Sequence, residues 1–209
     1  MVDTTYICCG RVFCPDRLDE IEKSLKLILN SYESQKYLDT ILTRPTKQKI
    51  ESLSALSGLL YLCRHEGINI GELKFMRDEK CKPYLEGSQY HISFSHSGGL
   101  FASALSVQKI GIDIETKRYE KEHAYAVAQR FFCKEEIDFI ESEPQKNFIK
   151  VWTRKEAYVK MCGSTLSEQI NKFNTQKSVY DFSDFEYRGG MVALCRPFAG
   201  KTEIYTYNI

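Results

Sequence analysis

The spacing of hydrophobic residues predicts helices in two separate regions of the chain. In the first region, Ile50, Leu53, Leu56 and Leu60 recur at the spacing of one face of an α-helix, and Gly67 follows where a C-terminal cap belongs. The predicted helices are Leu18–Leu29, Thr46–His65, Ala124–Phe132, Lys134–Glu141 and Gln145–Met161, the last of them closed by Gly163.

Between residues 90 and 115 the pattern changes to the period of two that is typical of strands. A Gly98-Gly99 turn and a tight Gln108-Lys109 connection divide this stretch, so we expect an antiparallel meander of three strands. The predicted strands are Thr4–Cys9, Ile92–Phe94, Phe101–Val107, Ile110–Ile114, Val179–Tyr187, Met191–Cys195 and Glu203–Tyr207.

Helices followed by strands occur twice along the chain. The first long helix is followed by Leu-Lys-Phe at 73–75 and the second by Asn-Lys-Phe at 171–173, which makes a weak internal repeat. The same order also arises by chance in α+β proteins. We predict an α+β fold of two similar halves, residues 1–108 and 109–209, related by a pseudo-twofold axis with a cleft between them.

Composition narrows the class of protein only a little. The 209 residues are 43% hydrophobic, and 29 Lys and Arg against 28 Asp and Glu give a net charge of +1. A chain of this size buries a substantial core without disulfides or metal ions. Near-neutral charge argues against a protein that coats nucleic acid, because such a protein needs a strongly basic face. A local basic pocket remains compatible with it.

The eight cysteines are scattered and include no C-x-x-C pair, which argues against a zinc ribbon or finger. The first residues carry no basic stretch followed by a long apolar run, and no segment approaches the ~18 apolar residues of a membrane span. We therefore expect reduced thiols, a cytoplasmic location and no contact with a membrane.

Two carboxylates share one face of a predicted strand. In the segment Gly-Ile-Asp-Ile-Glu at 111–115, Asp113 and Glu115 alternate with isoleucines and so project together. A hard divalent cation such as Mg²⁺ relieves the repulsion between two carboxylates, taking its other ligands from water and phosphate. On the pattern alone, an amphipathic strand with its acidic face in water is the simpler interpretation.

A second group of polar residues follows one stripe of a predicted helix. Trp152, Glu156 and Lys160 are each four residues apart, so Glu156 can serve as a metal ligand or base and Lys160 as a point charge for a phosphate. The alternative is an ordinary surface salt bridge, worth only ~0.3–0.5 kcal/mol.

The turn after the predicted strand Ile92–Phe94 offers groups that bind an anion. Ser95 and His96 precede Gly98-Gly99, where hydroxyl, imidazole and backbone N–H groups gather. Neighbouring strand residues point to opposite faces and no G-x-S-x-G elbow occurs, so serine hydrolase chemistry is disfavoured. From residue 36 to 82, nine Lys and Arg outnumber six Asp and Glu, and this modest excess is largely explained by solvated helix faces.

Taken in order, these motifs resemble those of the surfactin-type (Sfp-type) 4′-phosphopantetheinyl transferases. The shared motifs are Lys82-Pro83-Tyr84, Phe94-Ser95-His96-Ser97-Gly98, Gly111-Ile112-Asp113-Ile114-Glu115, Arg130-Phe131-Phe132 and Trp152-x-x-Lys155-Glu156-Ala157-x-x-Lys160. The resemblance implies two similar α+β halves with coenzyme A between them. It implies transfer of the 4′-phosphopantetheine arm to a serine of an apo acyl, peptidyl or aryl carrier protein, with release of adenosine 3′,5′-bisphosphate.

The resemblance also assigns the reacting end of the site. Asp113, Glu115 and Glu156 would hold Mg²⁺, or Mn²⁺ in its place, against the pyrophosphate of coenzyme A. Lys160 would contact that pyrophosphate and stabilise the charge that builds on the leaving bisphosphate. Glu156, or a water that it orients, would be the general base for the carrier serine.

At the nucleotide end, the resemblance assigns the 3′-phosphate and adenine to Lys82, Ser95 and His96. Members of the family carry basic residues ahead of the long first-half helix and an Arg within it, whereas residues 52–58 here contain none. Residues that can substitute are Lys36, Arg44, Lys47 and Lys49. Cys81 also stands where glycine is common.

Two other functions are compatible with parts of the pattern. A binding module with a degenerate site would have no reason to combine three carboxylates with Lys160. Another Mg²⁺-dependent phosphoryl or nucleotidyl transferase would be expected to carry a glycine-rich phosphate loop, and none occurs. We expect a monomer, because two halves in one chain already supply both walls of the cleft. The pathway served, whether fatty acid, polyketide or nonribosomal peptide biosynthesis, stays open.

Overall fold

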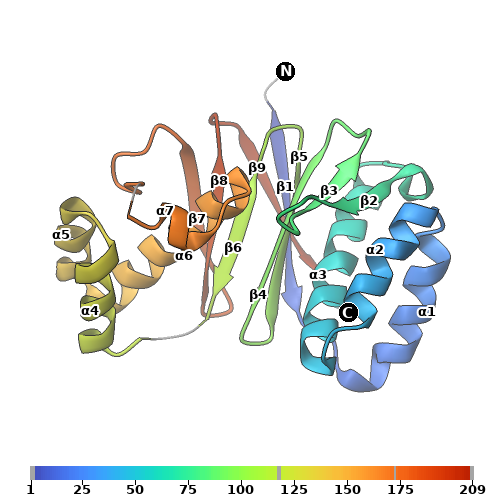
Figure 1. Cartoon of the computed structure of the whole chain (residues 1–209), viewed down its shortest axis with the longest axis horizontal. Coiled ribbons are helices and arrows are strands. Elements are labelled where there is room, and N and C mark those ends of the chain that lie inside the picture. The colour runs from blue at the N-terminus through green and yellow to red at the C-terminus, as the bar shows by residue number, and fades with distance from the viewer. Residues whose placement is uncertain (1–2, 117–118, 172, 208–209) are drawn as a thin grey trace.

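The computed structural model describes residues 3–116, 119–171 and 173–207 and has an α+β architecture. Strands occupy the centre, with α1, α2 and α3 on one side and α4, α5 and α6 on the other (Figure 1). The helices are α1 (Leu18–Ile28), α2 (Tyr32–Leu42), α3 (Thr46–His65), α4 (Lys121–Phe131), α5 (Lys134–Ser142), α6 (Pro144–Cys162) and α7 (Leu166–Gln169), with short 3₁₀ turns at Pro15–Arg17 and Ile70–Glu72. The strands are β1 (Thr4–Arg11), β2 (Lys74–Arg77), β3 (Pro83–Glu86), β4 (His91–Ser97), β5 (Leu100–Ser106), β6 (Gly111–Glu115), β7 (Asp181–Tyr187), β8 (Gly190–Arg196) and β9 (Lys201–Tyr207).

Each half carries one long helix on a small sheet. The first sheet has the order β4-β5-β1-β9 and packs against α3, and the second has the order β6-β8-β7 and packs against α6. A separate hairpin joins β2 to β3. All pairs are antiparallel except β1 with β9, which run parallel. The α+β fold class is confirmed, although β9, which lies beyond residue 108, joins the first sheet.

The two sheets pack face to face through their hydrophobic positions. Ile7 and Ala102 of the first sheet meet Ile112, Ile114 and Leu194 of the second in one buried cluster. Because strand side chains alternate, the opposite face of the first sheet is free to bury a separate cluster under α1, α2 and α3. The face that meets the second sheet is the one that holds the two halves together.

Beside that core, β4 and β6 are joined by serine side chains. Ser93 Oγ accepts a hydrogen bond from the backbone N–H of Ile112 (3.0 Å), Ser95 Oγ donates to Asp113 Oδ1 (2.7 Å), and Ser97 Oγ donates to Glu115 Oε2 (3.0 Å). We call Ser93, Ser95 and Ser97 the serine row. It brings the turn that was predicted to bind an anion next to the carboxylate strand.

The predicted three-stranded meander is wrong in its third strand. β4 and β5 form the expected hairpin, but β6 takes β8 as its backbone partner and belongs to the second sheet. The physical reason is the burial of Ile112 and Ile114 between the sheets, which requires β6 to lie in the opposite layer. A period of two predicts a strand and its faces but not the sheet that the strand joins.

Helix prediction was closer to the structure. The range Thr46–His65 is confirmed to the residue, and Gly67 and Gly163 adopt the positive φ of helix-ending glycines. α2 was missed, although Ser31 caps it by accepting from the N–H of Ser34 (3.2 Å). The internal repeat predicted a second strand-like segment, Asn-Lys-Phe, at 171–173. Residues 171 and 173 are not in a strand, and residue 172 lies outside the described part of the chain.

Candidate active site

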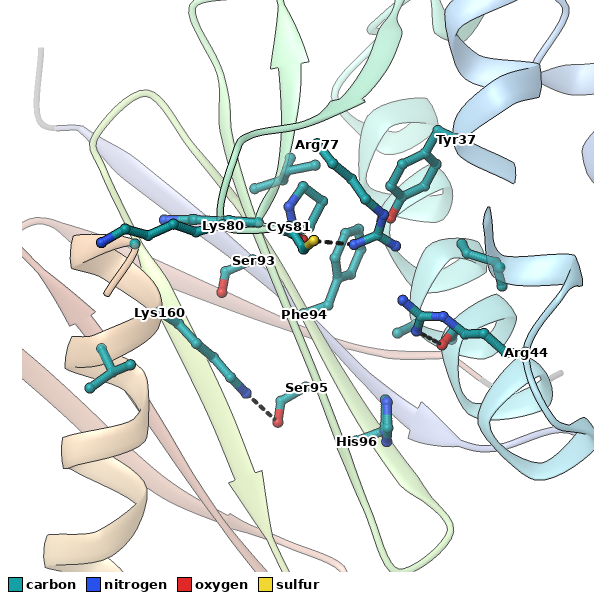
Figure 2. Close-up of a pocket in the computed structure, with 18 of the residues that line it drawn as sticks. Tyr37, Arg44, Arg77, Lys80, Cys81, Ser93, Phe94, Ser95, His96 and Lys160 are labelled. Carbon is teal, nitrogen blue, oxygen red and sulfur yellow. Dashed lines mark hydrogen bonds between the residues drawn. The ribbon is translucent and has the colours of Figure 1, made fainter. Parts of the chain in front are cut away.

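A pocket of about 370 Å³ opens between α3, α6 and the strands β3 and β4. Five cationic side chains line it together with His96, and no Asp or Glu is among its described lining residues. These cations are Arg44, Arg77, Lys80, Lys82 and Lys160. Figure 2 shows Lys160 reaching in from α6 while Arg44 and Arg77 approach from the other side. Such a concentration of positive charge in a concave site favours a ligand with several negative charges.

Lys160 connects this pocket to the carboxylate strand. Its Nζ donates to Ser95 Oγ (2.9 Å) and to Asp113 Oδ1 (2.7 Å), while Ser95 donates to the same carboxylate oxygen (2.7 Å). The structure therefore brings together three residues that the sequence placed in three separate motifs. Lys160 is the last residue of the stripe Trp152, Glu156 and Lys160 on α6. Because it also lines the pocket, a ligand bound there would contact Lys160.

The second oxygen of Asp113 is the most unusual polar atom of the site. Asp113 is 3% exposed, and its Oδ2 is buried without a hydrogen-bond partner in the described part of the chain. An unsatisfied buried carboxylate oxygen is costly unless something else occupies its lone pairs. Asp113 Oδ2 is therefore the atom of the site that can accept a further positively charged group.

Negative charge is concentrated around Glu156. Burial raises the pKa of Glu156, and the charges of Asp113 and Glu115 raise it further, while Lys160 opposes them. Tyr119 feels the same three carboxylates, because burial and then Glu115, Glu156 and Asp113 raise its pKa. The predicted trio is thus close enough to interact electrostatically.

The trio does not, however, converge on one point. Across residues 3–116, 119–171 and 173–207, no group of three His, Cys, Asp or Glu side chains is arranged tightly enough to hold a metal ion. Asp113 is turned toward Lys160, and Glu115 accepts from Ser97. A three-carboxylate metal set stays a prediction, to which the structure adds the proximity of its members.

Lys82 and His96, which were predicted to bind the same end of one ligand, both line the pocket. Lys82 Nζ donates to the carbonyl of Met161 at the end of α6 (3.2 Å), and burial lowers the pKa of Lys82. His96 Nδ1 lies 3.4 Å from Glu51 Oε2 of α3. Burial is the main cause of a lowered pKa for His96, which Glu51 opposes.

Of the four first-half cations considered from the sequence, Arg44 is the one that lines the pocket, and its guanidinium donates to Ser52 Oγ (2.8 Å). Arg77 was not singled out from the sequence, although it lies in the basic stretch. Its guanidinium donates to Thr40 Oγ1 (3.2 Å) and to the carbonyl of Cys81 (2.8 Å). Arg77 is the last residue of β2, just before a turn, and this position could have indicated from the sequence that it is a candidate pocket residue.

The turn between β2 and β3 explains why glycine would suit position 81. Asp78 Oδ1 accepts from the backbone N–H groups of Lys80 (3.0 Å) and Lys82 (2.8 Å) and so bends the chain tightly. Cys81 between them has φ of 63°, a conformation that glycine adopts without a Cβ penalty. In this chain the turn carries a cysteine that lines the pocket.

Comparison with known proteins agrees with this geometry. Residues 109–195, which include β6, α6 and the carboxylates, match the model of the 4′-phosphopantetheinyl transferase superfamily. The matched segment is less than half of the chain. The matched segment contains Asp113, Glu156 and Lys160, while Arg44 and Arg77 lie before it.

Individual relatives carry the same name. The chain is 30% identical over 122 residues to 4′-phosphopantetheinyl transferase gsp of Aneurinibacillus migulanus, covering 56% of this chain and 50% of that protein. It is 29% identical over 120 residues to 4′-phosphopantetheinyl transferase Sfp of Bacillus subtilis (strain 168), covering 55% and 52%. The resemblance to Sfp-type phosphopantetheinyl transferases is confirmed, and the chain spans about half the length of these curated relatives.

The described helices differ from membrane-spanning helices in length and composition. None of them is both long enough and apolar enough to cross a membrane.

Proposed function

We propose that this chain transfers the 4′-phosphopantetheine arm of coenzyme A to a serine of an apo carrier protein. The observation that carries the proposal is the bridge made by Lys160, which belongs at once to a strongly cationic pocket and to a buried carboxylate. Coenzyme A is a nucleotide with three phosphate groups, so it matches a pocket of this charge. Its pyrophosphate would lie near Lys160, where the cationic pocket ends and the carboxylates begin.

The carboxylates fit a hard divalent cation. Asp113 Oδ2 is buried without a partner, and carboxylate oxygens are the ligands that Mg²⁺ prefers. Asp113, Glu115 and Glu156 would hold Mg²⁺, or Mn²⁺ in its place. When bound, the ion would neutralise charge on the pyrophosphate oxygens.

The remaining chemistry is assigned to side chains of this chain. Lys160 would leave part of its contact with Asp113 to bind the pyrophosphate and stabilise the leaving adenosine bisphosphate. Glu156, whose pKa is raised by burial, would take the proton of the carrier serine or orient a water that does so. Lys82, Ser95 and His96 would hold the nucleotide end of coenzyme A.

The partner is proposed to be an acyl, peptidyl or aryl carrier protein, in a fatty acid, polyketide or nonribosomal peptide pathway. Nothing in the fold calls for a second copy of the chain, because residues from both halves line the pocket, and we propose a cytoplasmic monomer.

The test incubates the chain with coenzyme A, Mg²⁺ and a panel of apo carrier proteins, and follows each carrier by intact-protein mass spectrometry. We expect at least one carrier to gain the mass of one 4′-phosphopantetheine group, and none to do so without coenzyme A. If no carrier in a broad panel gains this mass, the proposed function is wrong.

A matched pair of variants tests the role of Lys160. Lys160 and Lys150 lie on the same helix, are 30% and 31% exposed, and each pairs with an aspartate. Lys160→Met is expected to reduce transfer at least about 100-fold, because one aligned charge at the transition state contributes that much. Lys150→Met should keep near-native turnover.

A further inference from the structure

The third member of the serine row makes contacts that the assigned chemistry does not yet use. Ser97 is the last residue of β4, and its Oγ donates to Glu115 Oε2 (3.0 Å). The same Oγ accepts from the backbone N–H of Thr116 (3.2 Å) and lies 3.2 Å from the Thr116 hydroxyl. Because Glu115 is one of the three carboxylates proposed to hold Mg²⁺, Ser97 ties the end of β4 to a proposed metal ligand.

These contacts fix the direction of the Ser97 hydroxyl. A hydroxyl donates one hydrogen bond and accepts two. The backbone N–H of Thr116 can only donate, and an ionised carboxylate at Glu115 can only accept, so the Ser97 hydrogen faces Glu115. The Thr116 hydroxyl is then the donor to Ser97. The bonding capacity of Ser97 is filled, and its single donated bond goes to the carboxylate.

The turn after β4 makes room for this arrangement. Gly98 has a φ of 54°, and a Cβ added there would overlap the hydroxyl of Thr116. Any larger residue at this position would therefore push Thr116 away from Ser97. The glycine next to Ser97 thus allows the contact that completes the bonding of the serine.

Glu115 lies among like charges that favour rotation of its side chain away from the site. Burial, then Asp113 and Glu115, raise the pKa of Glu156, so the three carboxylates interact. A glutamate side chain has more rotating bonds than an aspartate, and fixing them costs conformational entropy. The hydrogen bond from Ser97 restricts these rotations by holding Oε2. An ion that this carboxylate binds then meets a side chain that is already ordered.

We propose that Ser97 is a positioning residue for the divalent cation of this site, because its hydroxyl holds the carboxylate of Glu115 in place. This inference rests on the proposed function, since it takes Glu115 as a ligand of Mg²⁺. Carboxylates that bind metal ions are themselves hydrogen-bonded, and loss of such a partner weakens metal affinity or activity roughly 10–100-fold. Mg²⁺ keeps several waters and uses only one or two carboxylates, so the oxygen held by Ser97 need not bind the ion itself.

The experiment measures the dissociation constant of Mn²⁺, used in place of Mg²⁺, from the electron paramagnetic resonance signal of the free ion. The full-length proteins are the native chain, Ser97→Ala, Glu115→Ala, the double variant and Ser106→Ala, each checked for folding by circular dichroism. Ser106 is the matched control because it ends β5, accepts from the N–H of Gln108 (3.2 Å) and lies 3.0 Å from Thr5 Oγ1. Within the described part of the chain, neither of these contacts of Ser106 involves a carboxylate.

We expect Ser97→Ala to weaken Mn²⁺ binding about tenfold and Ser106→Ala to leave it unchanged. In the Glu115→Ala background, loss of the Ser97 hydroxyl should have little further effect, because the serine acts through that carboxylate. An unchanged constant in folded Ser97→Ala overturns the proposal, and so does a full additive loss in the double variant or a native chain that binds no Mn²⁺. If Ser97→Ala does not fold, Ser97→Cys decides in the same way, because a thiol has similar shape but is a weak donor.

Transfer to a carrier is measured in parallel, so the two proposals can fail separately. Mn²⁺ binding that depends on Ser97 and Glu115, without any mass gain on a carrier, would remove the proposed function and keep the role of Ser97. Transfer by the native chain together with unchanged Mn²⁺ binding in Ser97→Ala would keep the function and overturn the inference about Ser97.

Discussion

Lys155, the residue before Glu156 on α6, supports a prediction about stability. Its side chain is 1% exposed and forms an ion pair of 3.0 Å with Glu136, which is 0% exposed. Its Nζ also donates to the carbonyls of Ile170 (2.7 Å) and Phe173 (2.6 Å). Glu136 in turn accepts from backbone N–H groups at Cys133 (3.1 Å) and at 175 (2.8 Å). This network ties α6, α5 and the segment after α7 together.

Lys155→Met leaves the Glu136 charge buried without its cation and orphans two carbonyls. Breaking a buried, hydrogen-bonded ion pair in this way costs about 3–5 kcal/mol of unfolding free energy. For a chain of this size, each kcal/mol corresponds to about 2–4 °C, so the melting temperature should fall by about 6–20 °C. Lys177→Met is the control, because Lys177 pairs with Glu135 at 2.6 Å but is 69% exposed, and its loss should lower the stability far less.

The assay is urea unfolding of Lys155→Met, Glu136→Gln and the double variant, with the slope and midpoint fitted separately. Because the two side chains share one network, the double variant should lose less stability than the sum of the single variants, by at least about 1 kcal/mol. Additive losses would refute the reasoning. A loss for Lys155→Met no larger than for Lys177→Met would refute it as well.

Three further predictions concern the site and its supports. Asp113→Asn should abolish transfer while circular dichroism stays native, and near-normal turnover would contradict its role as a ligand. Gly111→Ala should lower the unfolding free energy by about 3 kcal/mol, because the added Cβ would overlap the backbone of α6, whereas Gly71→Ala, with no atom closer than 3.5 Å to its added Cβ, is the tolerated control in the same calorimetric scan. Iodoacetamide at pH 8 should label exposed thiols only, as read by peptide mass spectrometry, and coenzyme A should slow labelling at Cys81 because that residue lines the pocket. Equal labelling of Cys81 with and without coenzyme A would contradict this placement. The exposed thiols are Cys14, Cys81 and Cys162. The thiols whose pKa burial raises to about 12 are Cys8, Cys9 and Cys63.

Much of the site could be predicted because its residues lie on regular elements. Alternation on β6 places Asp113 and Glu115 together, and helical spacing places Glu156 and Lys160 on one stripe. The contact of Lys160 with Asp113 could not be predicted in this way, because it depends on how β6 packs against α6. That packing needs Gly111, where a Cβ has no room.

Other features gave no sequence signal of their own. Lysine is rarely fully buried, so a run of alternating charges on α6 does not indicate that Lys155 lies inside the protein. The contact between β4 and β6 uses the hydroxyls of Ser93, Ser95 and Ser97 instead of a backbone ladder, and no periodicity in the sequence describes such a pairing. The parallel pairing of β9 with β1 is likewise a long-range choice of partner.

The position of β9 has a consequence for how the protein is made. Its residues Lys201–Tyr207 complete the first sheet by pairing with β1, so the edge of that sheet stays open while the whole second half is being synthesised. Ribosomes add roughly 5–20 residues per second, which leaves β1 with an unpaired edge for several seconds or more. During that time the nascent chain carries a strand edge that other chains can recognise. Chaperone cover during translation would therefore matter more for this protein than the finished sheet suggests, in which β1 is paired on both sides.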